Sequence, residues 1–269
     1  MWKCNERECA LRAQFIRDSE GAVMKQLLIW GVMLAVCLAS VVQGEESIAV
    51  LEQKAAVLTQ QGKYSEAVKV LSEVVANDAD HASAYYWRGR AHFCLGQVKE
   101  SLADFDKYVV LQPKAESRQW ERGISCYYAA EFERGAKQFE LYQTYHDQDV
   151  ENSVWRYLCV AKSENVDAAK KNLLPITADP RIPMMTIYAM YQGNATPEKV
   201  LEAAKGGKPG PEELNQRLFY ANLYIGLWHE AAGRNDEAKT YILESEKHKI
   251  GHYMWDVAHI HADRLRMSK

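Results

Sequence analysis

Residues 82–113 read ASAYYWRGRAHFCLGQVKESLADFDKYVVLQP, and residues 116–147 repeat their skeleton 34 residues later. The recurring positions hold the same residues: Arg88-Gly89 returns as Arg122-Gly123, Phe105 as Phe139 and Tyr108 as Tyr142. A period of this length is typical of paired helices that stack into a solenoid, because one pair alone cannot bury its apolar face. We see no strand-like alternation of polar and apolar residues in the sequence. The sequence therefore predicts an all-α superhelix.

The spacing of small and large residues resembles the pattern of tetratricopeptide repeat (TPR) proteins. In that family small residues let two helices approach closely, and large apolar residues fill the space between them. Residues 82–115 fit the pattern best, at Tyr85, Gly89, Gly96, Ser101, Phe105 and Pro113. The resemblance implies a TPR solenoid of about five to six helical hairpins that ends in a C-terminal capping helix.

The pattern divides residues 45–269, the expected TPR domain, into regular and irregular parts. Regular repeats are expected at 48–81, 82–115 and 116–149, followed by a degenerate region at 150–205. The segment GGKPGP at 206–211 is interpreted as a linker and not as a phosphate-binding loop, because proline follows its lysine. A final repeat is expected at 219–249 and the capping helix at 252–267.

The N-terminal part has the features of an export signal. Residues 24–44 begin MKQLLIWGVMLAV, with a basic residue, an apolar run and small residues near Gly44, as in a cleaved signal peptide. Residues 1–23 are interpreted as a mis-called extension before a true start at Met24, or as a disordered tail. We expect an exported, periplasmic or extracytoplasmic protein. The alternatives are an uncleaved membrane anchor that leaves the protein facing outward, or lipidation at Cys37.

Composition excludes some classes of function. The chain has 33 basic and 36 acidic residues, a net charge of -3, and its basic residues are dispersed, so nucleic-acid binding is not expected. It contains no GxSxG, CxxC or GxGxxG motif, so we predict no enzyme and no cofactor. Of its six cysteines, Cys94, Cys126 and Cys159 lie in the repeat region; an odd number argues against a disulfide framework and favours small core residues.

The C-terminal histidines are the remaining candidates for metal chemistry. His248 and His252 are four residues apart, as are His252 and Asp256, and His259 and Asp263. Gly251 interrupts the first pair, and neither a cysteine pair nor HExxH accompanies them. We therefore interpret these histidines as solvated or capping residues and predict no metal site. A metal-dependent activity is kept as an alternative.

In TPR proteins the first helix of each hairpin lines the concave groove. The resemblance places there a set of residues that we call the inner strip: Tyr86, Arg90, Phe93, Trp120, Ile124, Tyr127 and Tyr128. Tyr, Trp and Arg dominate binding hot spots, so the strip predicts a groove for a partner peptide or helix. The alternative is that the degenerate fourth unit folds inward and buries the strip as core. The Lys and Asn residues with which some TPR proteins clamp C-terminal carboxylates are missing here.

Residues 218–234 and 252–257 look like the exported NlpI-like group of TPR proteins. That resemblance implies an adaptor that holds envelope proteins, such as hydrolases or proteases, in complexes. A second hypothesis is a structural protein that self-associates through its irregular fourth and fifth units, with no peptide ligand.

Overall fold

The computed structural model describes residues 47–267, and every regular element in that range is a helix. The all-α prediction is thereby confirmed for this part of the chain. Residues 1–46, where the predicted extension and signal peptide fall, lie outside the described residues. The elements are α2 (Ile48–Gln60), α3 (Tyr64–Asn77), α4 (Ala82–Cys94), α5 (Val98–Leu111), the 3-10 helix η1 (Pro113–Arg118), α6 (Trp120–Tyr128), α7 (Phe132–Gln143), α8 (Val150–Ser163), α9 (Val166–Lys171), α10 (Met184–Gln192), α11 (Pro197–Lys205), α12 (Pro211–Ala231), α13 (Asn235–Lys247) and α14 (Tyr253–Met267).

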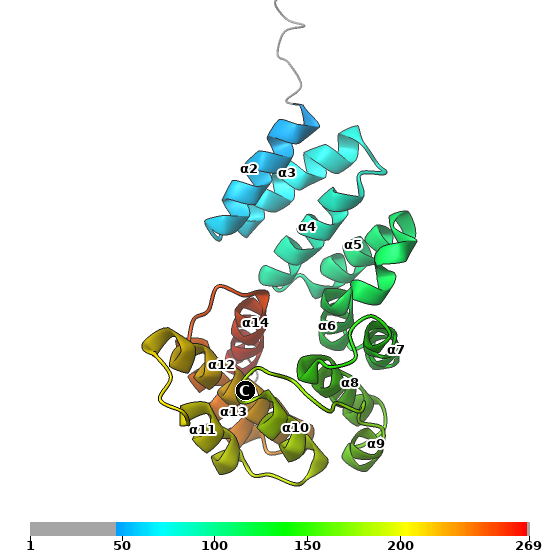
Figure 1. Ribbon diagram of the computed structural model, residues 1–269. Coiled ribbons are helices and arrows are strands. Elements are labelled where there is room, and N and C mark those ends of the chain that lie inside the picture. Colours follow the sequence, from blue (N-terminus) through cyan, green and yellow to red (C-terminus); the bar gives the residue numbers. More distant parts are fainter. Residues whose placement is uncertain (1–46, 268–269) are drawn as a thin grey trace, which may run out of the picture. The chain divides into compact units, whose positions relative to one another are not determined.

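Helices α2 to α9 form four successive hairpins that stack on one another (Figure 1). The first two hairpins turn at Gly62 and Gly96, whose φ angles of 70° and 72° lie in the left-handed region that glycine tolerates. The third turn has the same geometry without a glycine, because Ala130 adopts a φ of 63°. The stacked repeat is thus strong enough to hold a residue with a Cβ in a disfavoured conformation.

Small residues at the helix crossings set how closely the helices of a hairpin approach. A Cβ atom added at Gly123 on α6 would lie 2.6 Å from the ring of Phe139 on α7. Gly226 on α12 has the same role, since a Cβ there would lie 2.8 Å from the side chain of Ile242 on α13. Both crossings therefore exclude any larger residue without a shift of the packed helices.

The chain folds back after α9. Residues 172–183 lead into α10, and α10 and α12 then pack against α8 (Figure 1). The hydroxyl of Tyr191 on α10 donates to the carbonyl of Tyr224 on α12 at 2.9 Å. Helix α12 begins at Pro211, upstream of the repeat that we expected from residue 219, and it is buried along most of its second half.

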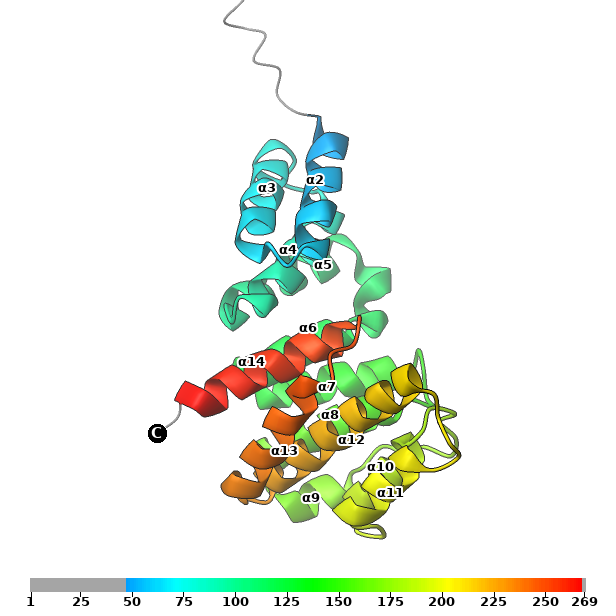
Figure 2. The same ribbon diagram turned by 90° about the vertical axis from the view of Figure 1, so that its left-hand side faces the viewer.

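Helix α14 lies alongside α6 and reaches α4 (Figure 2). The sequence predicts a capping helix at the end of the stack, whereas the structure places α14 across the first helices of the second and third hairpins. The reason is that its apolar residues Tyr253, Val257 and Ile260 are buried in one hydrophobic cluster with aromatic side chains of those hairpins and of α8.

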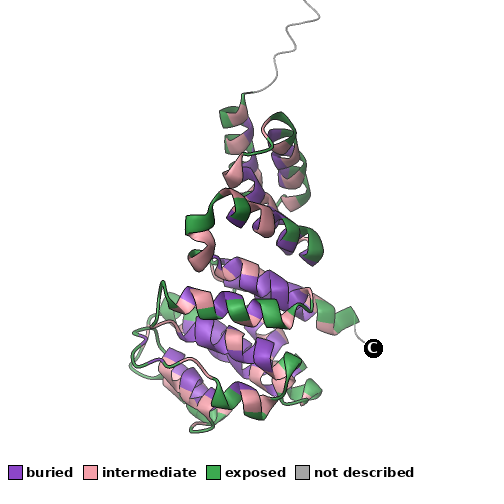
Figure 3. Ribbon diagram, turned by 90° about the vertical axis from the view of Figure 1, so that its right-hand side faces the viewer, coloured by how far each residue is buried: buried purple, intermediate pink, exposed green. Residues whose placement is uncertain are grey.

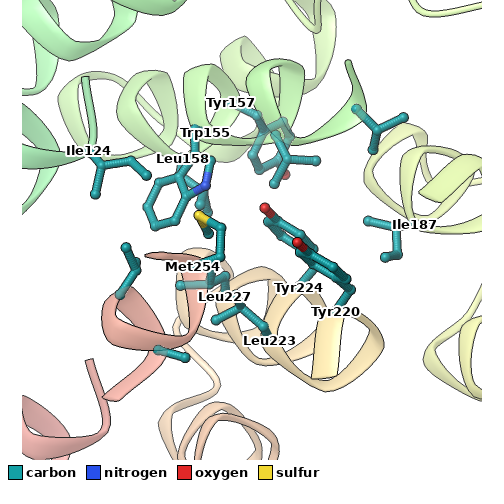
Figure 4. Close-up of a cluster of buried hydrophobic side chains, with 14 of the residues drawn as sticks. Ile124, Trp155, Tyr157, Leu158, Ile187, Tyr220, Leu223, Tyr224, Leu227 and Met254 are labelled. Carbon is teal, nitrogen blue, oxygen red and sulfur yellow. The ribbon is translucent and has the colours of Figure 1, made fainter. Parts of the chain in front are cut away.

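Within residues 47–267, the buried side chains form two hydrophobic clusters. The larger one runs from Phe93 on α4 to Ala262 on α14. Figure 3 marks the buried residues along the helices in purple. Figure 4 shows its centre, where Trp155 and Leu158 of α8 face Leu223 and Tyr224 of α12. The smaller cluster holds α2 and α3 against the start of α4. No described helix is long and apolar enough to cross a membrane.

Candidate functional site

The structure brings the seven residues of the inner strip onto one face, but it covers most of that face with the chain itself. Phe93, Ile124, Tyr127 and Tyr128 are buried, with exposures between 0% and 6%, while Tyr86, Arg90 and Trp120 stay partly exposed. Two helices cover it: α14 contacts Phe93 through Tyr253 and Tyr128 through His261, and Trp155 of α8 packs against Tyr127 and Tyr128. A peptide could reach these residues only after the covering helices had moved.

Tyr253, the first residue of α14, makes the central contacts with the strip. Its ring centroid lies 5.6 Å from that of Phe93 and 5.6 Å from that of Trp120, the second in an edge-to-face arrangement. The guanidinium of Arg90 lies 4.5 Å from the centroid of the same ring. These geometries are those of favourable aromatic and cation–π contacts, so α14 occupies the place that we had expected a partner to fill.

A polar network fixes the other part of α14. The His261 ring lies with Nδ1 2.9 Å from the Tyr128 hydroxyl and with Nε2 2.6 Å from a carboxylate oxygen of Glu230 on α12. Lys162 on α8 donates to the second Glu230 oxygen at 2.9 Å. Burial raises the pKa of Glu230, but His261 and Lys162 outweigh that effect and lower it to about 2.

The strip is therefore an internal contact surface over most of its length, covered mainly by α14, with further contacts from Trp155 of the degenerate fourth unit. The physical reason is the hydrophobic effect. Aromatic side chains have a large apolar area, and burying that area against one another lowers the free energy of the folded protein more than leaving it exposed to water does. A partner site on the exposed remainder, Tyr86, Arg90 and Trp120, stays a prediction. Tyr86 is already engaged, since its hydroxyl donates to Glu121 at 2.7 Å.

Next to the strip the structure leaves an open cleft of about 480 Å³ between α6, α7 and α8, the loop before α10 and the start of α14. We call it the lateral cleft. Its walls are aromatic: Trp120, Phe139, Tyr142 and Trp155. His252 stacks on Trp120 with ring centroids 6.1 Å apart and also lines the cleft. Trp120 is the inner-strip residue that reaches this open space.

Four charged side chains gather at one side of the lateral cleft. The Arg181 guanidinium lies 2.6 Å from a carboxylate oxygen of each of Asp149, Glu151 and Asp179. Burial raises the pKa of Asp179, but the hydrogen bonds from Arg181 dominate and lower it. Burial raises the pKa of Glu151 to about 7 even though Arg181 opposes it, and the Tyr224 hydroxyl also donates to Glu151.

Two polar atoms in the residues that line the lateral cleft have no hydrogen-bond partner among the described residues. They are Oδ1 of Asn152, an acceptor, and Nε1 of Trp155, a donor. Asn152 is 3% exposed and Trp155 is 2% exposed. A buried polar group without a partner costs about 1–3 kcal/mol. Both atoms are themselves buried, so they are a cost to the fold and not contact points for a molecule in the cleft.

Sequence reasoning missed the charged cluster. Asp149 is the last residue of the expected repeat 116–149, and residues 179–183, DPRIP, lie within the degenerate region, so the sequence does not bring them together. The structure joins the two because the chain folds back after α9 and brings Arg181 to the start of α8. The available signal in the sequence was an arginine between two prolines, and this pattern does not indicate which residues the arginine contacts.

The C-terminal histidines do not converge on one point. His248 contacts Asn215, the Asp256 carboxylate accepts from Tyr64, and His252 accepts from the backbone of Met254. Among the described residues, only Glu246, His259 and Asp263 could hold a metal ion together. Arg266 pairs with both carboxylates of that group, so a cation already neutralises them.

The three cysteines of the repeat region are free thiols. Cys126 and Cys159 are buried and Cys94 is half-buried. Burial raises the pKa of Cys126 to about 11, which keeps it a neutral thiol at physiological pH. Cys126 and Cys159 pack beside Gly135 on α7, as small residues at a close helix approach.

Known proteins with the same kind of helical hairpins resemble this chain. Residues 53–116 match the model of a tetratricopeptide repeat family. A tetratricopeptide repeat protein from Parabacteroides merdae aligns over 94% of this chain and 98% of its own, with a TM-score of 0.53 and 14% identity. MamA from Desulfovibrio magneticus aligns over 83% of this chain and 99% of its own, with a TM-score of 0.46 and 15% identity. A search of curated proteins gives no match.

Proposed function

Because the chain carries tetratricopeptide repeats and has the TPR fold, we propose that it is a non-enzymatic adaptor that binds a partner protein in the lateral cleft. The observation that carries the proposal is the cleft itself, which has aromatic walls and lies beside a strip that α14 already covers. Aromatic side chains at the centre of a recessed surface supply much of the affinity of protein interfaces.

The cleft suits this task better than the inner strip does. Binding to the strip would first require α14 to detach from Phe93 and Tyr128, which costs the free energy of those contacts. Binding in the cleft requires no such step, since Trp120 already faces open space there. We therefore propose that the partner contacts the lateral cleft and not the centre of the inner strip.

Site-specific photocrosslinking tests the proposal. His146 is exposed and lines the cleft. With benzoylphenylalanine at position 146 of the full chain in its source cells, we expect a discrete crosslinked product that contains another protein. Mass spectrometry of the product would identify that protein.

The matched control places the same photoreactive residue at Val110, which is 70% exposed on the second helix of its hairpin. Products that form equally at both positions would mean non-specific proximity and would contradict the proposal. A product at position 146 that contains only a second copy of this chain would favour the self-associating structural protein instead.

We further propose that the adaptor acts outside the cytoplasm, where it holds envelope proteins in complexes. The support is the sequence of residues 24–44 together with the NlpI-like resemblance of residues 218–234. The intact mass of the protein isolated from its source cells is expected to correspond to a chain that begins at Glu45. A mass that includes residues before Lys25, or a lipid on Cys37, would contradict cleavage and indicate a membrane-tethered protein.

A further inference from the structure

One wall of the lateral cleft is a segment between two helices. Residues 172–183, which we call the wall segment, join α9 to α10, and Asp179 and Arg181 line the cleft from this segment. Polar contacts hold the segment on the start of α8 and the loop before it. Gln148 accepts from the backbone of the segment at 2.9 Å, and the backbone nitrogen of Val150 donates to Asp179 at 3.2 Å. Such contacts can be exchanged for contacts with water, so the segment can part from α8 without the melting of a helix.

Three carboxyl groups at this junction share one cation. The Arg181 guanidinium lies 2.6 Å from an oxygen of each of Asp149, Glu151 and Asp179. Three negative charges against one positive charge are unfavourable at a place from which water is largely excluded. We therefore expect one of these carboxyl groups to hold a proton near neutral pH.

Glu151 is the carboxyl group best suited to hold that proton. Asp149 accepts from the backbone nitrogen of Glu151, and Asp179 accepts from two backbone nitrogens; such hydrogen bonds favour the ionised form. Glu151 is 9% exposed, and besides Arg181 it accepts from the hydroxyl of Tyr224 on α12. The structure thus places a buried carboxyl group where the wall segment, α8 and α12 meet.

The surroundings of Glu151 agree with this assignment. Its charged and titratable neighbours come from α7, the start of α8, the wall segment, α12 and the start of α14: Tyr142, Asp149, Asp179, Arg181, Tyr220, Tyr224 and His252. Burial raises the pKa of Glu151 to about 7, while Arg181 opposes the rise and Asp149 adds to it. Burial also lowers the pKa of His252, so Arg181 is the cation among these neighbours at neutral pH.

Proton binding by Glu151 is linked to the docking of the wall segment. With the segment docked, the pKa of Glu151 is about 7, whereas a glutamate carboxyl group in water has its ordinary value of 4.5. A carboxyl pKa that is raised in one state stabilises that state as the pH falls. Docking therefore gains stability as the pH falls from 7 toward 4.5, and it loses that stability as the pH rises through 7.

We propose that the wall segment is a pH-dependent wall of the lateral cleft, docked on α8 while Glu151 holds a proton and loosened when that proton passes to the solvent. Loosening takes Asp179 and Arg181 away from α8 and so changes the shape of the cleft. The inference rests on the proposed adaptor function for its consequence, since the partner then meets a fixed wall below neutral pH and a loose one above it.

Hydrogen exchange of the full chain, followed by mass spectrometry, tests the inference. The backbone amides of the wall segment are measured at pH 6 and pH 8, and each exchange rate is divided by the intrinsic rate at that pH. With one proton bound at a pKa of about 7, we expect the protection of residues 174–182 to fall about tenfold from pH 6 to pH 8. Peptides from α4 and α5, which do not line the cleft, should keep the same protection.

A pair of variants separates Glu151 from His146 and His252, the histidines that line the cleft. Glu151→Gln keeps the size of the side chain and resembles the protonated form, so the protection of the wall segment should be equal at both pH values. Glu164→Gln makes the same chemical change at an exposed position that ends the same helix, and it should keep the fall of about tenfold. The peptides from α4 and α5 report whether each variant is folded.

Each outcome decides the inference. Equal protection of the wild-type wall segment at both pH values, or a fall in protection that persists in Glu151→Gln, would overturn it. The crosslinking result at position 146 is independent of these measurements. A crosslinked partner without a pH-dependent wall would leave the adaptor function standing, and a pH-dependent wall without a crosslinked partner would count against the adaptor alone.

Discussion

Replacing Tyr253 with alanine is expected to lower the free energy of unfolding by about 3–5 kcal/mol, the usual cost of deleting a buried aromatic side chain. Tyr253 is 4% exposed and contacts Phe93, Trp120 and Arg90, so it joins α14 to both the second and the third hairpin. Urea denaturation followed by circular dichroism measures the change. Ring-current and fluorescence signals of Trp120 should change with it.

The matched control is Tyr253→Phe. The Tyr253 hydroxyl is buried and has no hydrogen-bond partner among the described residues. Its removal should therefore leave the stability unchanged or raise it by about 1 kcal/mol, because an unsatisfied buried hydroxyl is itself unfavourable. If Tyr253→Phe destabilised the protein as much as Tyr253→Ala does, the hydroxyl would have a partner and the packing of α14 would differ from that seen here.

The second large effect concerns Glu230 and the pH dependence of stability. The pKa of Glu230 is lowered to about 2 in the folded protein from a reference value of 4.5. A lowered carboxyl pKa contributes stability that is fully present above 4.5 and is lost as the pH falls from 4.5 toward 2. That difference corresponds to about 3 kcal/mol, and the Glu230 side chain is only 18% exposed, so solvent screens it little.

We therefore expect Glu230→Gln to lower the free energy of unfolding by about 3 kcal/mol at pH 7, with the difference from wild type vanishing toward pH 2. Urea denaturation at pH 7, 4.5 and 3 measures both quantities. Glu212→Gln, at an exposed position in the first turn of the same helix, is the matched control and should not change the profile. A constant difference between Glu230→Gln and wild type at every pH would show that the carboxylate charge is not the source of the effect.

Much of the fold could be predicted because it depends on local spacing. Glycine at 89 and 123 and phenylalanine at 105 and 139 recur at one period, and the contacts that they make lie within single hairpins. Such contacts join residues close in the chain, so a repeat in the sequence becomes a repeat in space. The aromatic character of the inner strip was predictable for the same reason, because its residues also recur at fixed spacing.

The site could not be predicted, because it depends on contacts between distant segments. Tyr128 meets His261 across 133 residues, and Arg181 meets Glu151 across 30. Nothing in the spacing of residues 172–183 indicates that the chain folds back there. The aromatic strip looked equally suited to a partner and to a core, since both uses favour the same side chains.

The sequence by itself determined the helical hairpins, their turns and the aromatic character of the concave face. Only the tertiary structure decided that α14 covers that face and that the open surface lies instead between Trp120 and Arg181. The physical reason is that hairpin packing follows from side-chain size at fixed spacing, whereas the docking of α14 depends on the burial of apolar area contributed by several distant helices at once.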